Sequence, residues 1–379
     1  MRRGAALVVA LAALALPACT SSDHPGTGSP TGSPTSSPTG SSAGSSAGSQ
    51  GGSHGGPRVV GTVARDLQVP WGIAFLPGGD AVVTERDTKR VLRIDGTTHR
   101  VSVIATFADP VDPGAAGESG LLGVAVSPDF ATDHLLFFYE TTTSGNRIVE
   151  ATYDGGRLGP LRTVLDGIPA GFIHDGGRLA FGPDGYLYAS TGETGDSSLA
   201  QDKGSLGGKI LRITTDGEAA PGNPFGSPVW SYGHRNVEGL AFDDAGRLWA
   251  SEFGQDTWDE LNLIRPGRDY GWPLVEGKGG TGGLVDPQLV WPTDQASPSG
   301  LAWLDGHLWL AALHGARLWR VDVTGARAHD PRAFFVGAYG RLRTVVVAPD
   351  GMLWVTTSNR DGRGSPVAGD DRILLVDPT

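Results

Sequence analysis

A histidine and a carboxylate lie at the outer ends of one predicted β-hairpin. His174 precedes the segment 178–181 and Glu193 follows the segment 186–189; both segments partly alternate large apolar residues with others, as half-buried strands do. The residues 182–185 between them, Gly-Pro-Asp-Gly, form a tight-turn sequence, because proline presets φ and glycine tolerates positive φ. Both side chains therefore lie away from the turn, where they could share a site. Histidine changes its charge near neutral pH, so the pair is suited to proton transfer.

Six copies of one pattern follow each other along residues 58–379: a small apolar strand, a turn, and a second strand with aromatic or branched residues. The copies begin at Trp71, Leu122, Arg178, Gly239, Gly300 and Thr344. A third predicted strand, with a basic residue ahead of hydrophobic ones, begins at Arg90, Lys209, Arg317 and Arg372. Six units over this length give about 54 residues each, which is enough for blades of four strands.

The repeat predicts an all-β fold, a single six-bladed β-propeller with four-stranded blades. The segment Val59–Val63 is expected to close the ring against the last blade. A β-sandwich is the alternative, but it does not predict six copies of one pattern. Ligands of propellers usually meet the loops at one mouth of the central channel, so we expect the functional residues there.

Unusual polar residues recur just before the inner strands and just after the strands that follow them. Each has a structural explanation by itself, such as a satisfied core histidine, a rim arginine paired with a carboxylate, or a glutamate that caps a turn. Their recurrence at equivalent positions favours a shared site. The residues are Glu118, His174, Glu193, His234, Arg235, Asn236, the segment 251–256, Arg341 and Arg343. The arginines suit a compact polyanionic ligand, because guanidinium groups bind carboxylates bidentately.

The acidic stretch from Glu252 to Glu260 carries oxygen ligands of the kind that Ca²⁺ takes. The sequence contains no cluster of histidine and cysteine that indicates zinc. It also lacks a serine-nucleophile motif and a nucleotide-binding glycine motif in a fitting strand–helix context.

The first residues resemble a lipoprotein export signal. Arg2-Arg3 precede an apolar stretch, and Leu16–Cys19 fits a lipobox, in which the cysteine is lipidated and becomes the mature N-terminus. An ordinary secretory signal with a chance cysteine is the alternative. Because Cys19 is the only cysteine, the chain has no internal disulfide, thiolate metal site or cysteine nucleophile.

We therefore predict a signal peptide at 1–18, a lipidated Cys19 with a flexible Ser/Gly/Pro/Thr-rich tether at 19–57, and a catalytic domain at 58–379. The protein is expected to be exported and held on the outer face of the cell membrane through the lipid alone. Since Arg2, Arg3 and Asp23 are the charged residues before Arg58, the domain keeps 28 basic and 40 acidic residues, a net charge of −12. An acidic domain of this kind is a poor partner for nucleic acid or anionic lipid.

Five motifs in order along 58–379 resemble the soluble glucose/sorbosone dehydrogenase family, whose members are six-bladed propellers that use pyrroloquinoline quinone (PQQ) and calcium. The motifs are Glu118–Gly123, His174–Leu179, Tyr232–Asn236, Asp259–Ile264 and Tyr270–Pro273. The resemblance implies that His174 is the general base for the sugar C1 hydroxyl, while the C1 hydride passes to the quinone. It also implies that Arg235 stabilises charge on the reduced quinone.

The same resemblance implies the metal and cofactor contacts. Gly254 and Gln255 match the pair whose backbone carbonyls hold the PQQ-bound calcium, and Glu260 and Tyr270 match a second, structural calcium site. The matching cofactor contacts are Glu118, Glu193, Asn236, Trp291, Thr293, His314, Arg341 and Arg343.

Four positions depart from the best-known glucose dehydrogenases. Glu118 replaces glutamine, Glu193 replaces aspartate, Gln255 replaces proline, and His314 replaces a lysine that pairs with a PQQ carboxylate. A neutral His314 would weaken that contact. The loops are short compared with the specialised glucose enzymes, so we expect a broad aldose preference.

The leading hypothesis is a PQQ-dependent aldose dehydrogenase that forms lactones and passes electrons to an acceptor that the sequence does not identify. The first alternative is a non-catalytic binding propeller of the same lineage, and the retained His174 and Arg235 argue against it. The second is a calcium-dependent lactonase-type hydrolase. That enzyme needs three or four carboxylate or amide ligands on one axial calcium, and no such set can be assembled without residues of the proposed quinone site.

Overall fold

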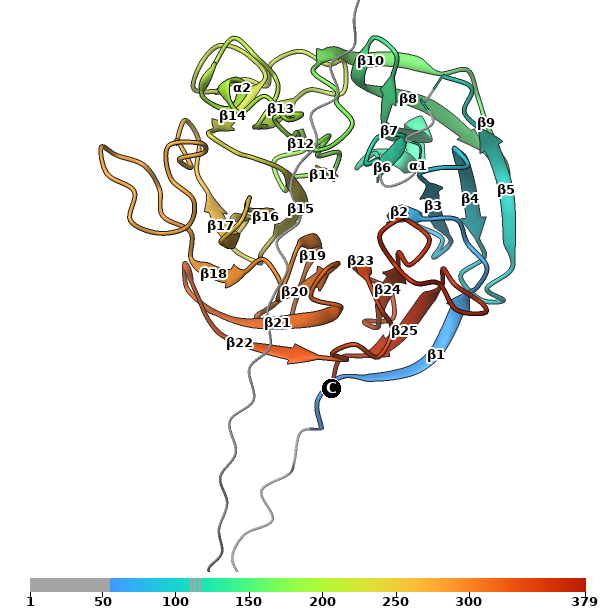
Figure 1. Ribbon diagram of the computed structural model, residues 1–379. Coiled ribbons are helices and arrows are strands. Elements are labelled where there is room, and N and C mark those ends of the chain that lie inside the picture. The colour runs from blue at the N-terminus through green and yellow to red at the C-terminus, as the bar shows by residue number, and fades with distance from the viewer. Residues whose placement is uncertain (1–54, 110, 112–113, 115–116) are drawn as a thin grey trace, which may run out of the picture. The chain divides into compact units, whose positions relative to one another are not determined.

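The computed structural model describes residues 55–109, 111, 114 and 117–379, and this part of the chain forms six small antiparallel sheets arranged in a ring (Figure 1). The predicted all-β, six-bladed propeller is therefore confirmed. The predicted signal peptide, Cys19 and the tether up to residue 54 lie outside the described residues. Within the described ranges, no helix is both long and apolar enough to cross a membrane.

Each blade begins with its inner strand and proceeds outward. Blade 1 contains β2 (Pro70–Phe75), β3 (Ala81–Glu85), β4 (Arg90–Ile94) and β5 (Val101–Thr106). Blade 2 contains β6 (Leu121–Val126), β7 (Leu135–Thr142), β8 (Gly145–Asp154) and β10 (Arg162–Ile168), with β9 (Arg157–Leu158) as a short fifth strand on β8. Blade 3 contains β11 (Leu179–Phe181), β12 (Leu187–Ser190), β13 (Lys209–Ile213) and β14 (Val229–Tyr232).

The other three blades follow the same order. Blade 4 contains β15 (Val237–Phe242), β16 (Leu248–Glu252), β17 (Trp258–Ile264) and β18 (Leu289–Pro292). Blade 5 contains β19 (Pro298–Leu304), β20 (His307–Ala312), β21 (Arg317–Thr324) and β22 (Arg327–Phe334). Blade 6 contains β23 (Leu342–Val347), β24 (Leu353–Thr357), β25 (Ile373–Asp377) and β1 (Arg58–Ala64). Two helices of one turn, α1 (Phe130–Asp133) and α2 (Ser198–Gln201), lie between strands.

The first strand of the domain closes the ring, as the sequence predicts for Val59–Val63. β1 pairs antiparallel with β25, so the outermost strand of blade 6 comes from the start of the domain and the other three from its end. An ion pair of 2.6 Å between Arg58 Nη2 and Asp377 Oδ2 joins the two ends of this pairing. Closure leaves the inner strands facing a common channel.

Glycine lets the inner strands pack backbone against backbone around the channel. A Cβ atom on Gly123 of β6 would lie 2.1 Å from the carbonyl oxygen of Gly177, and one on Gly239 of β15 would lie 2.4 Å from that of Ser299. No side chain fits at such distances. Gly72 and Gly300, near the start of two further copies, make the same kind of approach. The recurring glycine of the repeat is therefore a packing requirement.

A buried ionic network links inner strands of several blades below the loops. Glu238 Oε2 accepts hydrogen bonds from Arg343 Nη1 at 2.9 Å and from Ser299 Oγ at 2.6 Å. Arg178 Nε donates to the carbonyl oxygen of Glu238 at 2.8 Å, and its guanidinium lies 4.2 Å from the ring centroid of Trp71. Burial lowers the pKa of Arg178 to about 10. These contacts tie blades 1, 3, 4, 5 and 6 together.

We expect Gly123→Ala to lower the free energy of unfolding by about 1–3 kcal/mol, because the added methyl group must displace the backbone of blade 3. The control is Gly78→Ala, where nothing lies within 4 Å of the added atom, and we expect a change within about 0.5 kcal/mol. Denaturant unfolding of both variants measures the difference. Equal effects would contradict the packing role of Gly123.

A candidate active site at the mouth of the propeller

A cavity of about 470 Å³ lies among the loops that precede the inner strands and the loops that follow the second strands of the blades. Four blades contribute to its wall. Six of the predicted site residues line it, namely Glu118, Gly254, Gln255, Thr293, His314 and Arg341. Phe253 and Asp259, which belong to the segments 251–256 and 252–260 named from the sequence, also line it, as do Ser297 and Arg363, which the sequence did not indicate. The structure therefore brings together residues that are up to 245 positions apart in the chain.

His174 and Glu193 meet as the hairpin predicts. Nδ1 of His174 contacts Oε1 of Glu193, and both side chains are buried. Because a carboxylate accepts the hydrogen bond, Nδ1 carries the proton and Nε2 is the basic nitrogen. In the described part of the chain no hydrogen bond involves Nε2. The direct partner of His174 is thus Glu193, and this pair is the one suited to accept a proton from a ligand.

The backbone of His174 is held in an uncommon conformation. Its φ is 59°, in the left-handed region, where a residue other than glycine is costly. Glu118 Oε2 accepts the His174 backbone N–H at 2.7 Å, and the N–H of Thr194 donates to the His174 carbonyl at 3.2 Å. A Cβ atom on Gly192 would lie 1.9 Å from that carbonyl oxygen. Glu118 and the glycine therefore fix where the imidazole lies.

Blade 4 contains a second histidine–glutamate pair with a different environment. His234 Nδ1 lies 2.8 Å from Glu252 Oε2, and His234 Nε2 lies 2.8 Å from Ser231 Oγ. The ring stacks on Tyr270 at 4.7 Å and is fully buried. Because both ring nitrogens have partners, His234 is a structural residue. Its partner Glu252 also accepts the backbone N–H of Arg235 at 2.6 Å and so positions that arginine.

The side chain of Arg235 has an unmet hydrogen-bonding requirement. Its Nε is buried and has no hydrogen-bond partner among the described residues, and its guanidinium lies 5.5 Å from the ring centroid of Trp272. Burial lowers the pKa of Arg235, while Glu193 and Glu118 oppose that shift. A buried donor without an acceptor is costly. Arg235 therefore suits a ligand that offers an oxygen acceptor beside the His174–Glu193 pair.

The backbone at Gly254 and Gln255 is arranged to present carbonyl oxygens. Asp259 Oδ1 accepts the N–H of Gly254 at 2.9 Å, and Glu276 Oε1 accepts the N–H of Gln255 at 2.8 Å. In the described residues no hydrogen bond ends on either carbonyl oxygen. Burial raises the pKa of Asp259 to about 7. Carbonyl oxygens beside carboxylates are ligands for Ca²⁺, so these residues fit the calcium that the resemblance implies.

Glu260 and Tyr270, the predicted second calcium site, lie away from the cavity wall. Glu260 Oε1 accepts the N–H of Gly277 at 2.8 Å, and Oε2 accepts a hydrogen bond from Asn262 at 2.9 Å. Burial, with Glu252 nearby, raises the pKa of Glu260 to about 8. The Tyr270 hydroxyl donates to the backbone at 2.8 Å. A cation beside these buried carboxylates would relieve their repulsion.

Four predicted cofactor contacts, Glu193, Asn236, Trp291 and Arg343, are not among the residues that line this cavity, and neither are the predicted catalytic residues His174 and Arg235. Arg343 is 2% exposed and donates a hydrogen bond to Glu238 in the ionic network. It follows Arg341 by two residues, so in extended chain it lies about 7 Å farther along the strand than Arg341 does. Arg341 and Arg343 still share one carboxylate, because both lie within 3.6 Å of Asp361 Oδ2, but only Arg341 lines the cavity. Trp291 is buried in the core, with its ring 5.5 Å from that of Trp319. Asn236 uses its side-chain oxygen to accept the Gly176 N–H at 3.0 Å.

The loop after β24 completes the mouth and was missed by the sequence analysis. Asp361 Oδ2 accepts a hydrogen bond from Arg341 Nε at 2.8 Å, and Arg363 Nη1 pairs with Glu118 Oε1 at 2.6 Å. Burial would raise the pKa of Glu118, but Arg363 and the His174 N–H lower it below its usual value. The loop follows β24 just as Glu193 follows β12. That repeat position is the signal that could have identified it.

Comparison with known proteins identifies one family. Residues 67–373 match the family model described as Glucose / Sorbosone dehydrogenase. The chain is 30% identical to the aldose sugar dehydrogenase of Escherichia coli (strain K12), over 78% of this chain and 89% of that protein. It is also 30% identical to quinoprotein glucose dehydrogenase B of Acinetobacter calcoaceticus, over 57% of this chain and 52% of that protein.

A solved structure extends this similarity. The PQQ-bound aldose sugar dehydrogenase from Streptomyces coelicolor is 56% identical to the chain and superimposes with a TM-score of 0.82. The match covers 85% of this chain and 97% of that structure.

We expect Glu118→Gln and Arg363→Gln to show a coupling free energy of about 0.5–1 kcal/mol at pH 7 in a double-mutant cycle measured by denaturant unfolding. Because Arg363 holds the pKa of Glu118 low, the coupling should be fully present above the ordinary glutamate pKa and be lost as the pH falls below that value and through the lowered pKa of Glu118 in the folded protein. The control pair is Arg162 with Asp216, which are 3.5 Å apart and exposed; its coupling should be near zero. Equal coupling in both cycles would contradict the prediction.

Proposed function

Because the chain belongs to the glucose/sorbosone dehydrogenase family, we propose that it is a PQQ-dependent aldose dehydrogenase that oxidises the C1 hydroxyl of aldose sugars to lactones. The observation that carries the proposal is the His174–Glu193 pair beside Arg235, whose buried Nε has no hydrogen-bond partner among the described residues. When bound, calcium-held PQQ would supply the electrophilic carbonyl that accepts the hydride. Every other role belongs to residues of the chain.

The proton is taken by His174. Its Nε2 accepts the proton of the sugar hydroxyl, and Glu193 stabilises the resulting imidazolium through Nδ1. Glu118 keeps the imidazole in place through the His174 backbone. The arrangement removes the hydroxyl proton as the hydride leaves C1, so the sugar loses one proton and one hydride, which together amount to two protons and two electrons.

Cations and backbone oxygens of the mouth would hold the cofactor. PQQ carries three carboxylates, and Arg341, Thr293 and His314 line the cavity with groups that can donate to them. Arg235 would donate to a quinone oxygen and stabilise the negative charge that develops there. The carbonyl oxygens of Gly254 and Gln255 would hold the calcium ion.

The lactonase alternative is disfavoured by the contacts around the channel. A hydrolase of that type needs several carboxylate or amide ligands on one axial calcium. The carboxylate of Glu238, which belongs to the buried ionic network between the inner strands, accepts hydrogen bonds from Arg343 and Ser299. It is therefore occupied by protein donors and is not arranged as a calcium ligand. We further propose lipid anchoring through Cys19 on the outer face of the cell membrane. This rests on the lipobox motif alone.

Reconstitution tests the proposal directly. We expect the absorption spectrum of PQQ to change when PQQ is mixed with the purified protein and Ca²⁺. The reconstituted protein should then reduce an artificial dye when aldoses from a panel are added as substrates. A calcium chelator present before PQQ is added should prevent both effects. The proposal fails if PQQ produces no spectral change and no aldose reduces the dye.

His174→Ala should lower kcat by about 10²–10⁴-fold, the contribution of a positioned general base, while PQQ affinity changes little. Glu193→Gln should lower kcat in the same direction, because the imidazolium loses its anionic partner. PQQ titration and steady-state kinetics measure both variants. Loss of PQQ binding by His174→Ala, with normal turnover per bound cofactor, would instead assign His174 a cofactor-binding role.

A further inference from the structure

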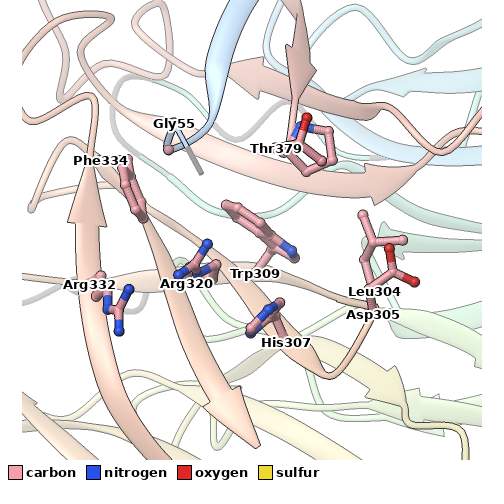
Figure 2. Close-up of a pocket in the computed structure, with 11 residues that line it drawn as sticks. Gly55, Leu304, Asp305, His307, Trp309, Arg320, Arg332, Phe334 and Thr379 are labelled. Carbon is pink, nitrogen blue, oxygen red and sulfur yellow. The ribbon is translucent and has the colours of Figure 1, made fainter. Parts of the chain in front are cut away.

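A second cavity, of about 500 Å³, lies in blade 5 away from the mouth (Figure 2). Its wall includes Leu304, His307, Trp309, Arg320, Arg332 and Phe334. The two cavities lie at opposite ends of β20. His307, the first residue of β20, lines the blade 5 cavity, and His314, which follows the last residue of β20, lines the mouth cavity. Residues seven apart in an extended strand are separated by about 20 Å. The two cavities are therefore distinct sites.

Aromatic rings and a guanidinium form one side of this cavity. Trp309 is 1% exposed, and its ring lies 6.4 Å from that of Phe334. The guanidinium carbon of Arg320 lies 5.9 Å from the centroid of Trp309 and 5.8 Å from that of Phe334. Figure 2 shows Trp309 in the middle of the group, with Arg320 and Phe334 on one side and Leu304 and Asp305 on the other. Such a wall suits an apolar face of a small ring.

Unsatisfied polar atoms are concentrated here. Trp309 Nε1, Arg320 Nε, His307 Nδ1 and Asp322 Oδ1 are buried and have no hydrogen-bond partner in the described part of the chain. The His307 and Asp322 atoms are 2.9 Å apart, but not in the orientation of a hydrogen bond. Arg320 Nε is 3.8 Å from the same carboxylate oxygen. A native fold seldom leaves such a group together without a ligand or water.

The unsatisfied set restricts the chemistry of a ligand. It contains donors in the wall, the indole and guanidinium N–H groups, and Asp305 is the carboxylate that lines the cavity. A carboxylate or phosphate could pair with the guanidinium groups, but it would leave the faces of Trp309 and Phe334 uncovered and would meet Asp305 in the wall. A hydroxyl group donates and accepts, and a sugar ring presents several hydroxyls beside an apolar C–H face. The volume lies within the range of small-molecule sites.

We propose that the blade 5 cavity is a second, non-catalytic site that binds the ring of a neutral saccharide. The indole N–H of Trp309 and the guanidinium of Arg320 donate to ring hydroxyls, and Asp305, which lines the cavity, accepts from one. The apolar face of the sugar lies against the aromatic wall. The site requires no cofactor, so it is independent of the redox activity proposed for the mouth.

The test measures binding to the full protein without PQQ. We expect calorimetry or ligand-observed NMR to detect glucose or maltose, and Trp309→Phe to weaken that binding about 3–10-fold, the effect of one lost hydrogen bond. Trp319→Phe is the matched control, because Trp319 lies in the same blade and donates to Gln295 outside the cavity; it should leave affinity unchanged. Thermal unfolding verifies that both variants are folded.

Two further arms identify the site and the ligand class. Arg341→Gln at the mouth should leave saccharide binding unchanged; if it abolishes binding while Trp309→Phe does not, the sugar occupies the mouth and the proposal is wrong. Gluconate and phosphate should bind more weakly than glucose. Binding of these anions without binding of neutral sugars would overturn the assignment, as would the absence of any saccharide binding.

Discussion

The close approach of the inner strands around the channel is the constraint on which the other features depend. Gly123 and Gly239 allow backbone contacts that a Cβ atom would block, and the inner strands thereby pack against one another around the channel. Their preceding loops consequently meet at one mouth. The ionic network of Glu238, Arg178 and Arg343 then links blades below that mouth. The glycines and buried charges thus position the loops whose side chains form the candidate site.

Carboxylates organise the mouth by holding other groups. Glu118 fixes the His174 backbone, Glu252 fixes that of Arg235, and Glu276 fixes the segment at Gln255. Each carboxylate satisfies N–H groups that would otherwise be unpaired near the cavity. This explains how an acidic domain can present an anion-binding site. These three carboxylates accept hydrogen bonds from backbone N–H groups, and Glu118 also pairs with Arg363, while the buried Nε of Arg235 has no partner among the described residues.

The two histidine–glutamate pairs show how similar places in the repeat can serve two purposes. His174 and His234 stand shortly before the inner strands of blades 3 and 4, beside Glu193, which follows β12, and Glu252, which ends β16. His234 also contacts Ser231 and stacks on Tyr270, whereas His174 retains a nitrogen without a partner in the described residues. The repeat supplies the pair, and the surrounding loops decide whether it is structural or available to a ligand.

The sequence by itself determined the fold class, the number of blades, the closing strand and six of the residues that line the mouth cavity, because strand alternation and repeat position are local patterns. It also predicted that His174 and Glu193 lie at the same end of one hairpin. Only the tertiary structure decided which arginines face the cavity. Arg341 and Arg343 are two residues apart and so lie on the same face of an extended segment. Arg343 lies farther along that segment, where it pairs with Glu238 in the ionic network. The pairing of Glu118 with Arg363 and the blade 5 cavity join segments far apart in the chain, and no local pattern encodes such contacts.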